Sequence, residues 1–175
     1  MDIIDNAISP SLFNLIKEDV ESAGFPWFFL KEASGATKGS RDNLDYSFFH
    51  LALSHDNISD FYDMSMAVAL LLKDKFSMDE KYAVNRLRWG MTTKASQAWR
   101  NKPHTDVNEN HMVILFYLTD TDGDTYFYDK NHKIIDSVSP KANRAVLFDG
   151  LCLHSSSKPT KSDRRIVLNI NLKEK

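Results

Sequence analysis

The sequence predicts an α+β fold in which short antiparallel strands form a sandwich or jelly roll braced by two N-terminal helices. Helical periodicity is confined to the first 80 residues. From about residue 82 the chain changes to short segments rich in β-branched and aromatic residues, separated by turn signals. Many short strands at regular spacing are typical of antiparallel sandwiches and jelly rolls. The length favours one domain over residues 1–175, with support in 1–80 and the jelly roll in 81–175.

Residues 9–22 and 59–76 are the two predicted helices, and they are expected to cover one outer face of the sheet. Ser9 is suited to cap the first helix, and Pro10 fits its first turn. Both segments repeat apolar residues at helical spacing. The expected apolar faces hold Leu12, Leu15 and Ile16 in the first helix, and Phe61, Met64, Val68, Leu71 and Leu72 in the second.

Runs of aromatic and β-branched residues predict the strands. Two of these runs, residues 25–30 and 46–53, lie in the N-terminal half. Turn signals separate the later runs, and Asp122-Gly123 among them is predicted to be a hairpin turn. The later strands are expected at residues 82–89, 111–119, 124–129, 132–138, 143–149, 151–155 and 165–172.

The composition limits the class of protein. Hydrophobic residues make up 42% of the chain, and the formal net charge is only −2, so a general binder of nucleic acid or membrane surfaces is not expected. Cys152 is the only cysteine, which rules out a disulfide within the chain and fits a reducing compartment. The sequence has neither a signal peptide nor an apolar run long enough to cross a bilayer. We therefore expect a cytoplasmic protein.

The stretch KPHTDVNEN (102–110) places a histidine and an aspartate two positions apart. In an extended segment, His104 and Asp106 project from the same face. His154, at the end of a later strand, is a candidate third ligand. Two histidines and one carboxylate form the facial triad that holds Fe(II) while leaving coordination positions open. The alternative is that His-x-Asp arises by chance and that His154 is an ordinary strand-end residue.

The strand expected at 165–172 has two unlike faces. One face is aliphatic and is expected to pack against the core, while the other is polar and is expected to line a pocket. Arg165 on the polar face is the candidate anion-binding residue, because a guanidinium pairs with a carboxylate through two parallel hydrogen bonds. The pocket face holds Arg165, Val167, Asn169 and Asn171, whereas the core face holds Ile166, Leu168, Ile170 and Leu172, with Arg164 at its rim.

The order His-x-Asp, His, Arg on short strands resembles the Fe(II)/2-oxoglutarate-dependent dioxygenases. The likeness is greatest to the prolyl-4-hydroxylase-like branch, especially its short bacteriophage members. The phrases that carry it are KPHTDVNE, VILFYLTDTDGDTYFYD, NRAVLFDGLCLHSS and RRIVLNINL, within about residues 82–172, and FPWFF near the N-terminus has a similar character. The resemblance implies a double-stranded β-helix, the cupin-like form of the jelly roll, as the core.

The resemblance also implies a function. The enzyme would use Fe(II) and O2 to couple the oxidative decarboxylation of 2-oxoglutarate to the hydroxylation of a C–H bond. His104, Asp106 and His154 would be the metal ligands and catalytic residues. Arg165 would bind the distal carboxylate of 2-oxoglutarate, and Tyr117 would bond the same group. The partners would be 2-oxoglutarate and an unidentified substrate, which is a small molecule, a protein or a peptide with a prolyl residue. A phage-encoded protein would act in the host-cell cytoplasm.

Several residues keep alternative interpretations. Tyr117 is otherwise a core aromatic whose hydroxyl is satisfied elsewhere. Cys152 shares the parity of His154 and is a conceivable thiolate ligand, although a small buried hydrophobe is favoured. The stretch before the His-x-Asp is longer than the tight loop of many relatives, so Arg88 and Trp89 receive no role.

The charge pattern around the triad is also uneven. Residues 81–105 contain six Lys and Arg and no acid, whereas residues 106–129 contain acids and no Lys or Arg. Residues 91–102, MTTKASQAWRNK, lack strand alternation and are predicted to form a mobile segment over the iron, with Trp99 gripping substrate. The alternative is a solvated loop whose charges are balanced elsewhere.

Two other classes of protein remain as rivals at this point. One is a jelly roll that binds a metal or ligand without catalysis, and it leaves Arg165 unexplained. The other is a structural, virion-associated β-sandwich in which the histidines and the aspartate are incidental.

Overall fold

The computed structural model describes residues 1–31, 46–54 and 57–175, and its architecture is α+β, as predicted. Two helices accompany two sheets, and every strand pair in the described residues is antiparallel. The helices are α1 (Pro10–Glu21) and α2 (Tyr62–Lys75), and the strands are β1 (Asp2–Ile4), β2 (Phe28–Leu30), β3 (Ser47–Ser54), β4 (Asn57–Ile58), β5 (Tyr82–Thr93), β6 (Met112–Tyr117), β7 (Thr125–Tyr128), β8 (Ile134–Val138), β9 (Arg144–Asp149), β10 (Leu153–Ser156) and β11 (Arg164–Glu174).

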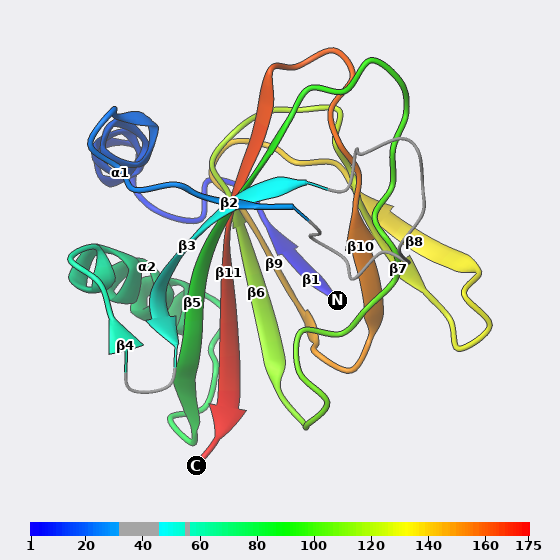
Figure 1. The fold of residues 1–175 in the computed structure, drawn as a ribbon. Helices are drawn as coiled ribbons and strands as arrows, with labels where there is room; N and C mark the ends of the chain where they lie inside the picture. The colour runs from blue at the N-terminus through cyan, green and yellow to red at the C-terminus, as the bar shows by residue number, and fades with distance from the viewer. Residues whose placement is uncertain (32–45, 55–56) are drawn as a thin grey trace.

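The larger sheet runs in the order β1-β9-β6-β11-β5-β3-β2, with β4 also paired to β3. The smaller sheet runs in the order β10-β7-β8. Figure 1 shows α1 and α2 on one side of the larger sheet and the smaller sheet on the other. The expectation that both helices cover one face of the sheet is therefore confirmed.

Helix α1 begins as its sequence predicts. The hydroxyl of Ser9 accepts a hydrogen bond from the backbone N–H of Leu12, and Pro10 occupies the first turn. The expected face is wrong at one position, because Leu15 is 62% exposed while Phe13 is buried. The buried side of α1 is thus rotated by about a quarter of a turn from the expected face, toward Phe13, Ile16 and Val20.

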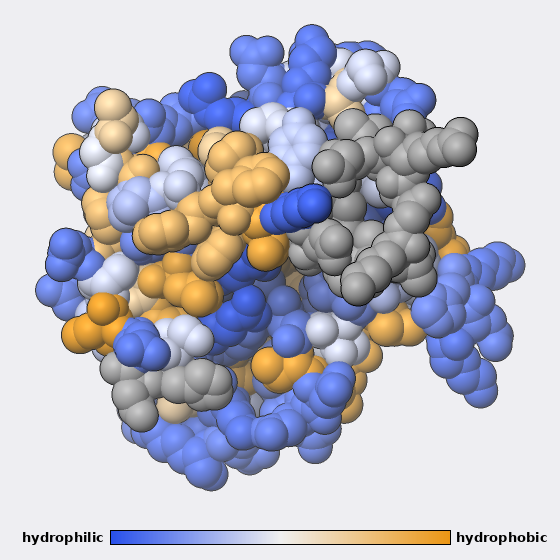
Figure 2. Space-filling view, viewed as in Figure 1, coloured by the Kyte–Doolittle hydropathy of each residue, from blue (hydrophilic) through white to orange (hydrophobic). Residues whose placement is uncertain are grey.

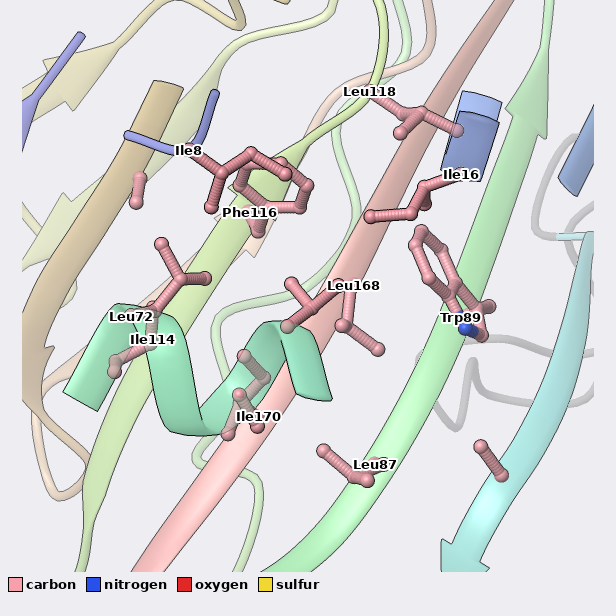
Figure 3. Close-up of a cluster of buried hydrophobic side chains, with 14 of the residues drawn as sticks. Ile8, Ile16, Leu72, Leu87, Trp89, Ile114, Phe116, Leu118, Leu168 and Ile170 are labelled. Atoms are coloured by element: carbon pink, nitrogen blue, oxygen red, sulfur yellow. The ribbon is translucent and has the colours of Figure 1, made fainter. Parts of the chain in front are cut away.

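Helix α2 shows a similar correction. Val68 and Leu72 are buried as expected, but Leu71 is 44% exposed, and Ser65 is buried. Ser65 accepts a hydrogen bond from the indole N–H of Trp89, at 2.9 Å, so a polar residue on the buried face has a partner in the core. Ile16 of α1, Leu72 of α2 and Leu168 of β11 belong to one hydrophobic cluster between the helices and the larger sheet (Figure 3).

A second hydrophobic cluster lies between the two sheets. It joins side chains of β6, β9 and β11 to side chains of β7 and β8, and Cys152 packs against it. The larger sheet is therefore buried on both faces, which explains the nearly continuous apolar runs of its central strands. The buried members of this cluster are Val113, Leu115, Tyr117, Phe127, Val138, Val146, Phe148 and Val167.

The alternation predicted for β11 is confirmed. Ile166, Leu168, Ile170 and Leu172 join the cluster under the helices, while Arg165, Val167 and Asn169 line a cavity on the opposite face. Arg164 is exposed and forms an ion pair with Glu21 of α1, with 2.9 Å between Nη2 and Oε1.

Three strand predictions need correction. Asp122-Gly123 is no hairpin turn, because β6 and β7 are not paired and belong to different sheets. Only Phe28–Leu30 of the run 25–30 is a strand, because the ring of Phe25 is buried in the cluster below the helices. Strand β5 continues to Thr93, so the first three residues of the expected loop 91–102 are paired with β11.

Large apolar side chains gather on the face where β2 and β3 lie (Figure 2). Phe28, Phe29, Leu51 and Ile58 are the exposed ones among β2, β3 and β4. Neither α1 nor α2 is long enough and apolar enough to cross a bilayer.

Candidate metal centre

The three predicted ligands lie together at one end of the small sheet. Each of His104, Asp106 and His154 offers a ligand atom, and these atoms lie within 4.8 Å of one another. An isolated antiparallel bridge joins His104 to His154, with N–H···O distances of 3.0 and 2.9 Å in the two directions. The bridge fixes the His-x-Asp segment against β10, so residues about fifty positions apart meet through backbone pairing.

Both imidazoles are held in the orientation that a metal ligand needs. Nδ1 of His104 lies 3.0 Å from the carbonyl oxygen of Lys102, and Nδ1 of His154 lies 3.0 Å from that of Cys152. Since a carbonyl only accepts, each Nδ1 carries the hydrogen and each Nε2 keeps a free lone pair. This arrangement is the usual support for a histidine that binds metal through Nε2.

The carboxylate of Asp106 is held by side chains of β11 and β5. Its Oδ2 accepts hydrogen bonds from Nδ2 of Asn169, at 2.9 Å, and of Asn171, at 3.2 Å. Nη1 of Arg86 lies 3.5 Å from Oδ1 and also donates to Oδ1 of Asn171, at 3.2 Å. The carboxylate is therefore fixed in position from two strands before any metal binds.

The protonation of the cluster suits a cation. Burial alone would raise the pKa of Asp106, but His154, the hydrogen bond from Asn169 and the charge of Arg86 hold this pKa below its usual value. Burial lowers the pKa of His154, although Asp106 opposes this effect. An ionised Asp106 beside a neutral His154 offers the donor atoms that a divalent cation requires.

Arg165 is buried at one end of the same cavity, only 4% exposed. Its Nη2 donates to Oγ1 of Thr125 at 2.9 Å, while its Nε makes no hydrogen bond in the described part of the chain. Burial lowers the pKa of Arg165, yet a guanidinium keeps its charge in proteins. A buried cation with an unused donor is suited to receive an anion.

Tyr117 lies behind Arg165 and does not line the cavity. Its hydroxyl is 2.7 Å from Oγ1 of Thr125, and its ring lies 5.4 Å from the guanidinium carbon of Arg165. Burial raises the pKa of Tyr117, so this phenol remains protonated. Thr125, a cavity residue that the sequence pattern did not single out, stands between Tyr117 and the cavity.

Gly123 explains how Arg165 reaches this position. A Cβ at residue 123 would lie 2.8 Å from the carbonyl oxygen of Ser157 and 3.2 Å from Cδ of Arg165. The absence of a side chain therefore lets the β6–β7 connection pass directly over the stem of Arg165.

Trp99 does not lie over the metal cluster, and that prediction is wrong. It lines a separate hollow with Arg100 and Tyr126. The residues of the expected loop 91–102 that line the metal cavity are Met91, Thr92 and Asn101. Backbone hydrogen bonds from Asn101 to Ser156 and from Lys158 to Trp99 attach the segment to the chain that follows β10.

Cys152 lies outside the three-residue metal cluster. Burial raises the pKa of its thiol, which favours the uncharged form of a small hydrophobic residue over a thiolate ligand.

Some residues of the site carried no recognisable sequence signal. Arg86 and Thr125 stand in ordinary strand patterns, and their roles depend on neighbours far along the chain. Asn169 and Asn171 were placed on the pocket face by strand parity. Trp89 is fully buried in the core, whereas Arg88 lines the cavity.

Two histidines and one carboxylate that leave coordination positions open are typical of one class of protein, the non-haem Fe(II) oxygenases. Here they line a cavity that strands of both antiparallel sheets form, beside a buried arginine. Residues 92–173 match the sequence model of the 2OG-Fe(II) oxygenase superfamily. The matched segment contains His104, Asp106, His154 and Arg165, so the part of the chain that holds the site is similar in sequence to the 2-oxoglutarate- and Fe(II)-dependent oxygenases. No curated protein sequence matches the chain.

Solved structures share the fold at low sequence identity. A 2OG-Fe(II) oxygenase family oxidoreductase from Burkholderia pseudomallei has a TM-score of 0.71 at 12% identity, over 97% of this chain and 83% of that one. A prolyl hydroxylase from Trichoplax adhaerens, in complex with a hypoxia inducible factor peptide, has a TM-score of 0.65 at 13% identity, over 99% of this chain and 83% of that one. A viral collagen prolyl hydroxylase from Paramecium Bursaria Chlorella virus-1 has a TM-score of 0.56 at 12% identity, over 99% of this chain and 89% of that one.

Proposed function

We propose that this protein is a dioxygenase that converts 2-oxoglutarate, O2 and a C–H substrate into succinate, CO2 and the hydroxylated product. One oxygen atom of O2 enters succinate and the other enters the product, so the atoms balance. The observation that carries the proposal is the arrangement of His104, Asp106 and His154 in one cavity with the buried Arg165.

We also propose that the two sheets form the double-stranded β-helix typical of this superfamily. The single domain and the cytoplasmic location stay predictions.

In this proposal His104, Asp106 and His154 hold Fe(II). The donor set fits that ion, since both Nε2 atoms are free of hydrogen and the carboxylate is ionised and supported by Asn169. Bound Fe(II) would supply the activation of O2 at the coordination positions that the three ligands leave open.

Arg165 would bind the distal carboxylate of 2-oxoglutarate. Thr125 holds the guanidinium through Nη2, and the buried Nε is available for the carboxylate. Tyr117 would act as a positioning residue through Thr125, rather than by the direct contact that the family resemblance implied. The walls between Arg165 and the metal cluster are apolar at Leu115 and Val167, which excludes water from the cosubstrate.

A prolyl residue in a peptide is the substrate that we favour. The support is the likeness to two prolyl hydroxylases, one of them in complex with a peptide. A small-molecule substrate is the alternative. A screen of peptides and metabolites for added mass of one oxygen atom would decide between them.

The proposed function is tested by succinate release from 2-oxoglutarate with Fe(II) and no added substrate. The wild type is expected to release succinate slowly, and His154→Ala is expected to abolish the release. Mn(II) binding, followed by electron paramagnetic resonance, gives a second readout and should be lost in the same variant. Circular dichroism would verify that His154→Ala is folded. Equal Mn(II) binding by both proteins would overturn the assignment of the ligands.

The rival, a metal- or ligand-binding jelly roll without catalysis, explains less. A structural metal site needs no buried arginine beside it, and the burial of Arg165 costs free energy unless an anion binds. A protein that binds Mn(II) and 2-oxoglutarate tightly but releases no succinate with Fe(II) would favour this rival.

A further inference from the structure

Three arginines lie on the cavity side of β5 and β11, and only one of them lacks a polar partner. Arg86 bonds Asn171 and contacts Asp106, and Arg165 bonds Thr125. Arg88 lines the cavity, and within the described residues its guanidinium makes no hydrogen bond and no ion pair.

Arg88 is held in place without using its donors. Its guanidinium carbon lies 5.4 Å from the ring centroid of Phe49, a cation–π contact that needs no N–H donor. The five N–H groups, which lie in the plane of the guanidinium, remain available for hydrogen bonds. Burial lowers the pKa of Arg88, because the charged guanidinium loses part of its hydration free energy at this position.

The charges of the cavity leave room for another anion. Asp106 is the only carboxylate among the cavity-lining residues that the structure describes. Arg86 already contacts this carboxylate, and a bound divalent cation would neutralise it further. Arg88 is thus a surplus positive charge beside the metal cluster.

The carboxylate that Arg165 binds does not account for Arg88. The strand register places Arg88 opposite Asn169 and places Thr92 opposite Arg165, four residues further along β5. Four residues of strand span about 13 Å. A carboxylate bound at Arg165 therefore lies at the other end of this row, out of reach of Arg88.

From this arrangement we infer that the substrate carries an anionic group, a carboxylate or a phosphate, which pairs with Arg88. This inference rests on the proposed function and names the chemical class of its substrate. Arg88 is then the specificity-determining residue. It fixes the anion at the Arg88 end of the cavity, so that a C–H bond elsewhere in the substrate lies next to the metal.

The test is a panel of matched probes, each a carboxylate, its amide or the corresponding phosphate monoester, on capped prolyl peptides and small molecules. Binding to the Mn(II)- and 2-oxoglutarate-loaded protein is measured by calorimetry. We expect the hits to concentrate among the anionic members. Arg88→Gln should weaken those hits about 10- to 100-fold, because it removes a hydrogen bond to a charged group. Arg88→Lys should recover part of the affinity. The comparison of affinities for matched carboxylate and phosphate probes shows which anion the protein prefers.

Arg164→Gln is the matched control, because Arg164 is exposed and faces α1 rather than the cavity. It should bind every probe as the wild type does. Equal binding of acids and amides, no binding of any anionic probe, or unchanged binding by Arg88→Gln would overturn the inference. So would an equal loss of 2-oxoglutarate affinity in Arg88→Gln, which would assign Arg88 to the cosubstrate. If the wild type with Fe(II) releases no succinate at all, the proposed function itself fails.

Discussion

Arg165 donates a 2.9 Å hydrogen bond from Nη2 to Oγ1 of Thr125, and the hydroxyl of Tyr117 lies 2.7 Å from the same oxygen. The three groups come from β11, β7 and β6, so both sheets contribute to one buried polar chain. Since Arg165 can only donate, Thr125 must accept from it. The chain fixes the guanidinium while its Nε stays available in the cavity.

The first prediction separates two adjacent arginines. Arg165→Ala should weaken 2-oxoglutarate binding by about 2–5 kcal/mol, because a desolvated charge-assisted pair is lost. Arg165→Lys should recover only part of this loss, since an ammonium lacks the planar fork. Arg164→Ala should change the affinity little, because Arg164 pairs with Glu21 outside the cavity. Calorimetry on the Mn(II)-loaded variants provides the measurement. A damaging Arg164→Ala beside a silent Arg165→Ala would contradict the assignment.

The second prediction concerns Thr125. Thr125→Val keeps the shape of the side chain but leaves Nη2 of Arg165 without its acceptor and the hydroxyl of Tyr117 without its hydrogen-bond partner. Affinity for 2-oxoglutarate should fall about tenfold, the effect of one lost hydrogen bond to a charged group. Tyr117→Phe removes only the hydrogen bond to Thr125, which lies further from the cavity, and should reduce the affinity for 2-oxoglutarate by a few-fold at most. A larger effect of Tyr117→Phe than of Thr125→Val would argue for direct contact between Tyr117 and the cosubstrate.

The third prediction concerns the support of Asp106. Asn169→Ala removes the 2.9 Å hydrogen bond to Oδ2 and should weaken metal binding about 10- to 100-fold. Asn85→Ala is the matched control, since Asn85 is an exposed residue of β5. Competition between Mn(II) and a chelator would measure the two affinities. If Asn169→Ala binds Mn(II) as tightly as Asn85→Ala, the orientation of Asp106 does not depend on β11.

The fourth prediction concerns packing at Gly150. A Cβ there would lie 2.1 Å from Nε2 of His111, and this buried imidazole is held at Nδ1 by a contact of 2.7 Å to the carbonyl oxygen of Glu109. Gly150→Ala should therefore reduce the free energy of unfolding by about 1–3 kcal/mol. Gly90→Ala, whose Cβ would meet Val167 at 3.8 Å, should change it by less than about 1 kcal/mol. Urea denaturation of both variants is the measurement, and equal stabilities would contradict the packing described.

The fifth prediction is a pH dependence at the N-terminal segment. Side-chain hydrogen bonds from Arg144 and Lys141 lower the pKa of Asp5 from 3.8 to about 2. A lowered folded-state pKa means that this stabilisation is complete above about pH 4 and is lost as the pH falls toward 2. Because Asp5 is exposed, the contribution should be at most about 1 kcal/mol. The difference in unfolding free energy between the wild type and Asp5→Asn should shrink over this range. A constant difference would show that the pairing does not stabilise the fold.

The sequence was sufficient to predict most of the strands and the grouping of His104, Asp106 and His154. The short strands β1 and β4 were not predicted, and other predictions failed where a local pattern fits more than one structure. The strand periodicity around Arg165 is strict, because one face is buried under the helices and the other lines the cavity. In the helices, apolar residues occur outside the buried face, and Leu15 and Leu71 were therefore misplaced. Asp122-Gly123 has the composition of a hairpin turn, but whether the flanking strands pair is decided by their partners elsewhere. Asp122 instead binds the backbone of residues 160–162.

The position of β11 has a consequence for the synthesis of the protein. Residues 164–174 form the last strand, yet this strand lies between β5 and β6 near the middle of the larger sheet. Until it leaves the ribosome, β5 and β6 each present an unpaired edge, and the nascent chain exposes apolar surface that invites aggregation. The cavity also gains Arg165 and the support of Asp106 only at that moment. The larger sheet and the site are therefore completed in the same step, and a chain that ends before β11 is expected to be a target for chaperones rather than a partly active enzyme.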